Sequence, residues 1–360
     1  MSDPVHSALR TRFVELVGCR LPVVQTGMGW VSGANLTAAT SAAGGFGILA
    51  AVTMTPDQLR AAVAGVKART DAPFGVNFRA DQPDLADRVA FVVAEGVRLV
   101  SFAGAPTKDA VRRCHDAGVA VMPTVGARRH AEKVLEMGVD AVIAQGGEGG
   151  GHTGTVPTSL LLPQVVDAVG AEIPVLGAGG FADGRGLVAA LAYGADGIAM
   201  GTRFLLTQES HVPDSVKARY TAATVFDTVV TTALDGAPQR VIRTEVVDRL
   251  ERSPRLLRLP RAALAALRFR KETGTSLRDL LQEGRAMRRN QDLTLSQLAM
   301  AANAPMLIKA TMVDGKPEVG ILPTGQVTGV IDELPTVADL LTRIESEAET
   351  ALRLLSDRSE

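Results

Sequence analysis

One histidine lies in a glycine-rich loop that directly follows a short apolar run. Asp140 to Ala144 have strand character, and six of the nine residues after Gln145 are glycine. His152 lies within this loop. Glycine backbone can approach a flat or phosphorylated ligand closely because no Cβ intervenes, and an imidazole titrates near neutral pH. The pattern predicts that His152 takes a proton from a bound substrate, although an incidental solvated histidine on a flexible loop would show the same spacing.

The elements that must position this loop follow a recurring unit, in which a helix-like segment ends at a glycine and an apolar run follows. The unit recurs from Gly45 to Gly194 at intervals of roughly 25 residues. Glycine just past a helix ends it, and such apolar runs are typical of parallel strands that are covered on both faces. Further runs at 22–26, 74–77 and 174–176 bring the number of strands to eight. We predict an α/β fold, a (β/α)8 TIM barrel, with an open doubly wound sheet as the structural alternative.

The regular spacing stops after Thr202, which predicts an insertion. We expect residues 1–205 and about 315–360 to form the barrel, and about 206–314 to form a mainly helical lid or substrate segment. Residues 249–289 contain twelve Lys or Arg and four acidic residues, including Arg255, Arg258, Arg261, Arg268, Arg270 and Lys271. These cations are expected either on a solvated helical face, on a lid that faces an anionic tail such as the phosphates of coenzyme A, or in a homo-oligomer interface.

Composition limits the classes of partner. The chain has 360 residues, a formal net charge of −1 and 21% charged residues, so no strong field attracts nucleic acid or an acidic membrane surface. The charge-free stretch from Leu21 to Pro56 is interrupted by glycines and polar residues, which argues against a membrane span. Two cysteines favour the cytoplasm, and neither they nor the histidines have the spacing of a metal site. We expect a small-molecule substrate.

Two glycine turns follow the seventh and eighth strands. One is Val175 to Gly180, followed by a helix from about Asp183, and the other is Ile198 to Thr202. Barrels often bind phosphate at this position with backbone amides. The alternative is a Rossmann fingerprint, but Asp196 falls at the start of the next strand instead of its end, where a ribose-binding carboxylate belongs.

These motifs together resemble one protein family. The run Gln145-Gly-Gly-Glu-Gly-Gly-Gly-His152-Thr-Gly is similar to the signature of the nitronate monooxygenase (2-nitropropane dioxygenase-like) flavoproteins, whose usual form is Gln-Gly-x-Glu-Ala-Gly-Gly-His-x-Gly. The resemblance extends in order over about residues 20–205, through 25–29, 43–47, 75–77, 179–180 and 200–202.

The resemblance implies a TIM barrel that binds FMN, with His152 as the base that removes an acidic proton beside a nitro or carbonyl group. The flavin then takes the electrons, and oxygen or another acceptor reoxidises it. Residues 325–329, a predicted glycine loop that returns to the barrel mouth, add Gln326. The cofactor-binding residues expected are Gly27, Met28, Gly29, Asn77, Gln145, Gly150, Gly151, Gly179, Gly180, Ala199, Met200, Gly201, Thr202 and Gln326.

Two features depart from the family pattern. Gly149 replaces the usual alanine, and a small nitroalkane does not require the long basic segment. The family resemblance also covers enoyl-thioester reductases and an actinobacterial enzyme of steroid degradation that acts on coenzyme A thioesters. We therefore expect oxidation of alkyl nitronates first, and NAD(P)H-linked oxidation or reduction of coenzyme A thioesters as the alternative. A non-catalytic barrel that binds a phosphorylated metabolite is the second alternative.

Overall fold

The computed structural model describes residues 6–252 and 304–357, and a closed barrel of eight parallel strands lies at its centre. The barrel closes because β1 pairs with β2 on one side and with β9 on the other. Its strands are β1 (Val23–Gln25), β2 (Phe46–Ala50), β3 (Gly75–Arg79), β4 (Leu99–Ala103), β5 (Ala120–Val125), β6 (Val142–Gln145), β8 (Val175–Ala178) and β9 (Gly197–Met200). The predicted TIM barrel is confirmed, and the open sheet is wrong.

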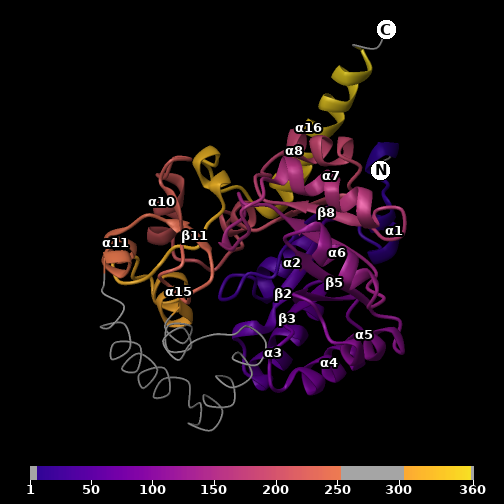
Figure 1. The fold of residues 1–360 in the computed structure, drawn as a ribbon, viewed down its shortest axis with the longest axis horizontal. Helices are drawn as coiled ribbons and strands as arrows, with labels where there is room; N and C mark the ends of the chain where they lie inside the picture. Colours follow the sequence, from indigo (N-terminus) through magenta and orange to yellow (C-terminus); the bar gives the residue numbers. More distant parts are fainter. Residues whose placement is uncertain (1–5, 253–303, 358–360) are drawn as a thin grey trace.

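Helices cover the outside of the barrel (Figure 1). The strands are apolar runs because both of their faces are buried; all five residues of β2, for example, are buried. The helices that alternate with the strands are α2 (Ala34–Ala42), α3 (Pro56–Lys67), α4 (Leu85–Ala94), α5 (Lys108–His115), α6 (Arg128–Leu135), α7 (Thr158–Val169) and α8 (Gly184–Ala192). The short elements η1 (Ser7–Leu9), α1 (Arg12–Val17), η2 (Ala51–Thr53) and α9 (Thr202–Leu205) complete this part.

Asp196 anchors the amino-terminal segment to the barrel. Its carboxylate accepts hydrogen bonds from Nε and Nη2 of Arg12 at 3.0 and 2.8 Å, and from the backbone N–H of Val175 at 3.0 Å. Asp196 lies just before β9, whereas the ribose-binding carboxylate of a dinucleotide site lies at the other end of its strand. This structural role excludes the Rossmann interpretation of residues 177–182.

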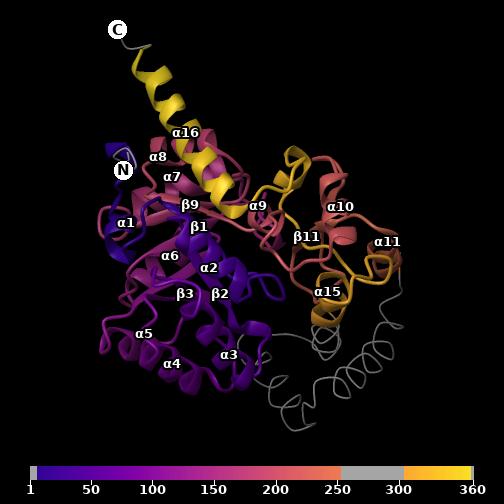
Figure 2. The same cartoon turned by 180° about the vertical axis from the view of Figure 1, so that it is seen from behind.

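A second unit lies beside the barrel (Figures 1 and 2). Its core is a three-stranded antiparallel sheet in the order β10 (Thr228–Thr231), β11 (Gln239–Ile242) and β7 (Gly151–His152). The strand β7 comes from the glycine loop after β6, so the predicted active-site loop belongs to both units. Around the sheet lie α10 (Asp214–Thr221), α11 (Glu245–Arg252), α15 (Ala304–Met312) and η3 (Gln326–Val330). The basic residues from Arg255 to Lys271 lie outside the described residues.

The last helix, α16 (Val337–Ser356), returns the chain to the barrel and packs on α8 (Figure 2). Thr336 caps its amino terminus by accepting a hydrogen bond from the N–H of Asp339. Glu347 in turn accepts one from the N–H of Gly184 at 2.9 Å. The helix predicted from about Asp183 is confirmed as α8, with Asp183 as its N-cap. Among the described helices, none combines the length and the apolar character needed to cross a membrane.

We expect Gly184→Ala to destabilise the protein, because α8 and α16 approach too closely for a methyl group. A Cβ at Gly184 would lie 2.3 Å from the carbonyl oxygen of Ile344 and 2.4 Å from the N of Ala348. Forcing the helices apart should lower the free energy of unfolding by about 1–3 kcal/mol in urea titrations. Gly186→Ala is the control, since its nearest contact is the Phe181 side chain at 3.1 Å. Equal stabilities of the two variants would contradict this packing.

Candidate active site

The loop after β6 is held against the barrel by a side chain from the strand itself. Gln145, the last residue of β6, donates from Nε2 to the carbonyl oxygen of His152 at 2.8 Å. The hydroxyl of Thr153 donates to the carbonyl oxygen of Gly146 at 3.1 Å. The loop therefore closes on itself and presents His152 at the carboxyl end of β6, which is the end that carries function in barrels.

The imidazole of His152 is hydrogen-bonded to a carboxylate from the second unit. Its Nε2 lies 2.7 Å from Oδ2 of Asp235, which lies 83 residues away between β10 and β11. The His152 side chain is 67% exposed, whereas the Asp235 side chain is only 11% exposed. A substrate can therefore reach the imidazole, while solvent hardly reaches its carboxylate partner.

Asp235 is ionised at neutral pH. Burial acts to raise its pKa, but hydrogen bonds from His152, the N–H of Ala237 and Gln239 outweigh burial and lower the pKa below the ordinary value of an aspartate. A carboxylate only accepts hydrogen bonds, so Nε2 of His152 carries the proton in this pair. The Nε2 atoms of His152 and Gln239 are 3.2 Å apart because both donate to the same oxygen, Oδ2 of Asp235. No described residue hydrogen-bonds Nδ1 of His152.

A second group of expected residues meets at the ends of β1, β3 and β9. Asn77 is buried and donates from Nδ2 to the hydroxyl of Ser101 at 3.2 Å. Gly27 lies against it, because a Cβ at Gly27 would be 2.4 Å from the Cβ of Asn77. Met28 places its sulfur 3.3 Å from the position of a Cβ on Gly201. The structure therefore brings the first loop, Asn77 and the turn after β9 together, while Gly29 lies farther out against Thr53.

The turn after β8 packs on the glycine loop. Gly179 and Gly180 have φ angles of 99° and 81°, which favour glycine. A Cβ on Gly179 would lie 3.1 Å from the backbone N of Gly149, whereas a Cβ on Gly180 would meet only the Cβ of Glu148, at 3.9 Å. The carboxylate of Glu148 accepts from the N–H and the hydroxyl of Thr158 at 2.9 and 2.7 Å. The two loops thus lie against each other at Gly179, and the space above Gly180 is open.

The loop at residues 325–329 returns to the barrel mouth, as predicted. The N–H of Gly325 donates to the hydroxyl of Thr202 at 2.9 Å, and the N–H of Gln326 donates to the carbonyl oxygen of Glu148 at 2.9 Å. The Gln326 side chain donates to the carbonyl oxygen of Val225 at 3.4 Å. Ala199 and Met200 are buried in β9, directly before Gly201 and Thr202. Gly150 lies so close to Thr324 that its Cβ would be 2.4 Å from the carbonyl carbon of that residue.

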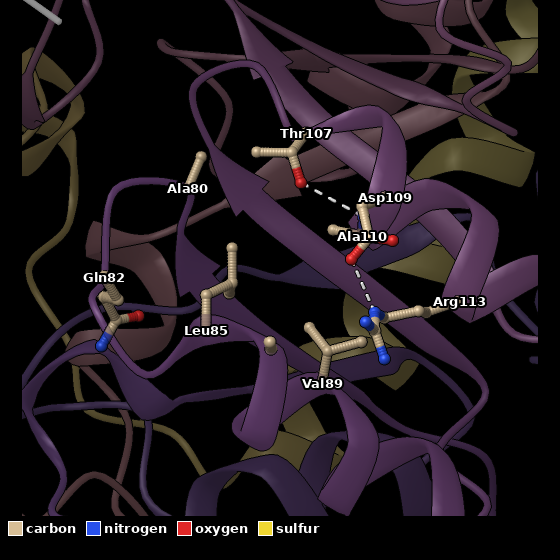
Figure 3. Close-up of a pocket in the computed structure, with 9 residues that line it drawn as sticks. Ala80, Gln82, Leu85, Val89, Thr107, Asp109, Ala110 and Arg113 are labelled. Atoms are coloured by element: carbon tan, nitrogen blue, oxygen red, sulfur yellow. Dashed lines mark hydrogen bonds and ion pairs between the residues drawn. The ribbon is translucent and has the colours of Figure 1, made fainter.

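A pocket between α4 and α5 is separate from this site (Figure 3). Its volume is about 210 Å³, and Leu85, Val89 and Ala110 line it together with the ion pair of Arg113 and Asp109. It contains none of the expected site residues. The glycine-lined mouth around His152 is the better candidate, because polar groups from several loops converge there.

Thiol and metal chemistry find little support in the described part of the chain. Burial raises the pKa of Cys19 and of Cys114 to about 12, so both thiols stay protonated at neutral pH. Within residues 6–252 and 304–357, no three His, Cys, Asp or Glu side chains gather as a metal site would require. His115 and His130 lie exposed on α5 and α6.

Sequence reasoning missed Asp235, Gln239 and the strand pairing that brings them to His152. Asp235 and Gly236 lie between the β-branched run 228–231 and the segment 239–242, which ends in Val-Ile, and this is the pattern of a hairpin. Gly236 has a φ of 90°, in keeping with such a turn. The hairpin was therefore readable from the sequence, but its pairing with a two-residue strand from the glycine loop was not.

The sequence model of one family, described as nitronate monooxygenase, matches residues 10–347. The chain belongs to the nitronate monooxygenase family. Membership of this family makes the chain an oxidoreductase, so the non-catalytic alternative is excluded.

Relatives within the nitronate monooxygenase family carry different names. A Mycobacterium tuberculosis protein named (3aS,4S,5R,7aS)-5-hydroxy-7a-methyl-1-oxo-octahydro-1H-indene-4-carboxyl-CoA dehydrogenase is 55% identical, over 97% of this chain and 98% of its own length. A probable nitronate monooxygenase of Staphylococcus saprophyticus is 30% identical, over 67% of this chain and 81% of its own. The solved structure of FabK from Thermotoga maritima matches with a TM-score of 0.79 and 34% identity, over 97% of this chain and 99% of that one.

We expect the Asp235 carboxylate to make stability depend on pH. Because its pKa is lower in the folded than in the unfolded protein, the carboxylate stabilises the fold above the unfolded pKa of about 3.9, and this contribution disappears as pH falls through the folded pKa. The difference in unfolding free energy between the wild type and Asp235→Asn should therefore be largest between pH 5 and 7, on the order of 1 kcal/mol, and shrink below pH 4. Urea titrations across this range measure it, and a difference that does not change with pH would contradict the assignment.

Proposed function

We propose that this protein is an FMN-dependent dehydrogenase of a coenzyme A thioester, with His152 as the base that removes the acidic proton beside the thioester carbonyl. The observation that carries the proposal is the His152–Asp235 pair, which leaves one imidazole nitrogen free for a substrate at the open end of the barrel. The 55% identity to a carboxyl-CoA dehydrogenase over nearly the full length of both chains supports the substrate class.

The residues at the barrel mouth fit a flavin mononucleotide. The turn of Gly179 and Gly180 offers backbone amides next to open space above Gly180, which suits a phosphate. The buried Asn77 and the backbone of residues 27–29 and 200–202 converge beside it. These residues would hold the group, and a flavin bound there would accept two electrons from the substrate.

His152 performs the proton transfer in this proposal. With Nε2 protonated and held by Asp235, Nδ1 carries the lone pair and takes the proton from the carbon next to the thioester carbonyl. The neighbouring carbon loses a hydride to the two-electron acceptor, so a carbon–carbon double bond forms in conjugation with the thioester. The substrate loses two hydrogen atoms in total, one as a proton on His152 and one as the hydride, and the charges balance.

Nitronate oxidation is the second candidate, and the family to which the chain belongs favours it. The carbon beside the nitro group of a neutral nitroalkane is acidic for the same reason as one beside a thioester, so the same base would convert a nitroalkane into the nitronate that is then oxidised. The match to the probable nitronate monooxygenase covers two thirds of this chain at 30% identity, whereas the match to the thioester dehydrogenase covers 97%. We therefore reverse the order expected from the motifs alone and place the thioester first.

The decisive test is anaerobic mixing of the FMN-loaded protein with the hydroxy-methyl-oxo-octahydroindene carboxyl-CoA of the relative's name. The oxidised flavin absorption should bleach, and the recovered thioester should be two hydrogen atoms lighter. The free acid without coenzyme A is the control and should bleach the flavin far more slowly. Bleaching by an alkyl nitronate but not by the thioester would overturn the proposal in favour of the second candidate. Bleaching by NADH alone would instead indicate the reductase direction.

We expect His152→Ala to keep FMN bound and to slow bleaching by the thioester by at least about 10²-fold, since general base catalysis is typically worth that much. The control is His130→Ala, because His130 is an exposed residue of α6 away from the site. It should retain the wild-type rate. A His152→Ala variant that bleaches at the wild-type rate would show that another group takes the proton.

A further inference from the structure

Asp235 is the centre of a partly buried polar cluster at the boundary of the two units. Its Oδ2 accepts from Nε2 of His152 at 2.7 Å and from Nε2 of Gln239 at 2.5 Å, and its Oδ1 accepts from the N–H of Ala237 at 3.0 Å. Gln239 is itself buried, with 2% of its surface exposed. The N–H of Ala237 in its own turn and the side chain of Gln239 on the next strand thus hold the carboxylate in place. Its Oδ2 then faces the imidazole of His152.

The backbone of His152 is held by the same segment of the second unit that carries Gln239. In the sheet His152 pairs with Gln239, and the N–H of Thr153 donates to the carbonyl oxygen of Pro238 at 3.1 Å. From the barrel side, Gln145 holds the carbonyl oxygen of His152. The main chain of His152 is therefore held on both sides, and this places the imidazole where Nε2 meets the carboxylate of Asp235.

The other charged groups near the loop are engaged elsewhere. Glu148 accepts from the N–H and hydroxyl of Thr158. The guanidinium of Arg240 donates to the carbonyl oxygen of Gly147 at 2.9 Å and to the hydroxyl of Thr228 at 2.9 Å. Asp235 is therefore the carboxylate, among the described residues, that contacts the imidazole of His152.

We infer that Asp235, held in place by Gln239, is a positioning residue that fixes His152 in the tautomer with the proton on Nε2, so that Nδ1 acts as the base. The catalytic consequence rests on the proposed function, whereas the tautomer does not. After proton transfer, the carboxylate also lies beside the new imidazolium and stabilises its charge. The second unit therefore supplies the carboxylate that holds the base, because the glycine loop that extends from the barrel supplies only the imidazole.

The tautomer can be observed directly in the full-length, FMN-loaded protein labelled with ¹⁵N-histidine. The chain has five histidines, and His152→Gln assigns the signals of His152. In the wild type, at a pH where His152 is neutral, we expect Nε2 to carry the proton and Nδ1 to be unprotonated. The opposite assignment in the wild type would overturn the inference, whatever the substrate proves to be and without any variant that must fold.

The matched variants are Asp235→Asn and Asp227→Asn. Asp227 is an exposed aspartate of the same unit, whose carboxylate accepts from the N–H and hydroxyl of Thr224. We expect Asp235→Asn to mix the two tautomers of His152 and to lower kcat with the thioester about 10²-fold or more while KM changes less than threefold. Asp227→Asn should keep the wild-type spectrum and kcat. An Asp235→Asn protein with the wild-type tautomer and kcat would overturn the inference.

The two proposals fail separately. If His152→Ala keeps full activity, His152 is not the base and the proposed function is wrong, although the nitrogen spectrum still reports whether Asp235 fixes the tautomer. If His152→Ala is inactive but Asp235→Asn is fully active, the proposed function stands and the positioning role of Asp235 is wrong. A fall in activity of Asp235→Asn that appears only as a raised KM would also contradict the positioning role, because a misplaced base lowers kcat.

Discussion

The close approach of the glycine loop to its neighbours is the constraint on which the site depends. A Cβ at Gly146 would lie 2.1 Å from the hydroxyl of Thr158, and a Cβ at Gly150 would lie 2.4 Å from the carbonyl carbon of Thr324. These distances leave no room for any side chain. The loop can therefore lie between α7, the turn after β8 and the returning loop at 324–326 only because residues 146 and 150 are glycine. This packing determines where His152 leaves the barrel.

The same constraint explains how two units share one site. Strands that run in parallel and close into a barrel bring the ends of β1, β3, β6, β8 and β9 to one face, where the expected cofactor residues meet. The glycine loop then extends past this face and pairs with β11 as β7. The barrel supplies the imidazole and the amides around the turn of Gly179, and the second unit supplies the carboxylate. Neither unit contains the whole arrangement.

The sequence predicted those parts of the structure that depend on neighbours along the chain. Glycines after helices and apolar runs gave the eight strands, and the Gly-rich turns located the barrel mouth, because each of these signals lies within one unit of the repeat. The Asp235 contact depends instead on residues 83 positions apart and on a strand of two residues, which periodicity cannot reveal. The preference for a small nitronate rested on the motifs of the barrel, whereas the match to the carboxyl-CoA relative covers 97% of this chain and so extends over most of the second unit.

The central claim is that His152 removes the proton beside a thioester carbonyl. A primary deuterium isotope effect tests it most directly, with the substrate deuterated at that carbon and flavin reduction followed anaerobically in the wild-type protein. The account predicts that deuterium at this position slows flavin reduction, since the bond to it breaks as Nδ1 takes the proton. The substrate in the relative's name also carries a hydroxyl group. An unchanged rate with deuterium beside the thioester carbonyl, together with a slowed rate when only the carbon that bears this hydroxyl is deuterated, would contradict the account. That result would indicate oxidation of the alcohol.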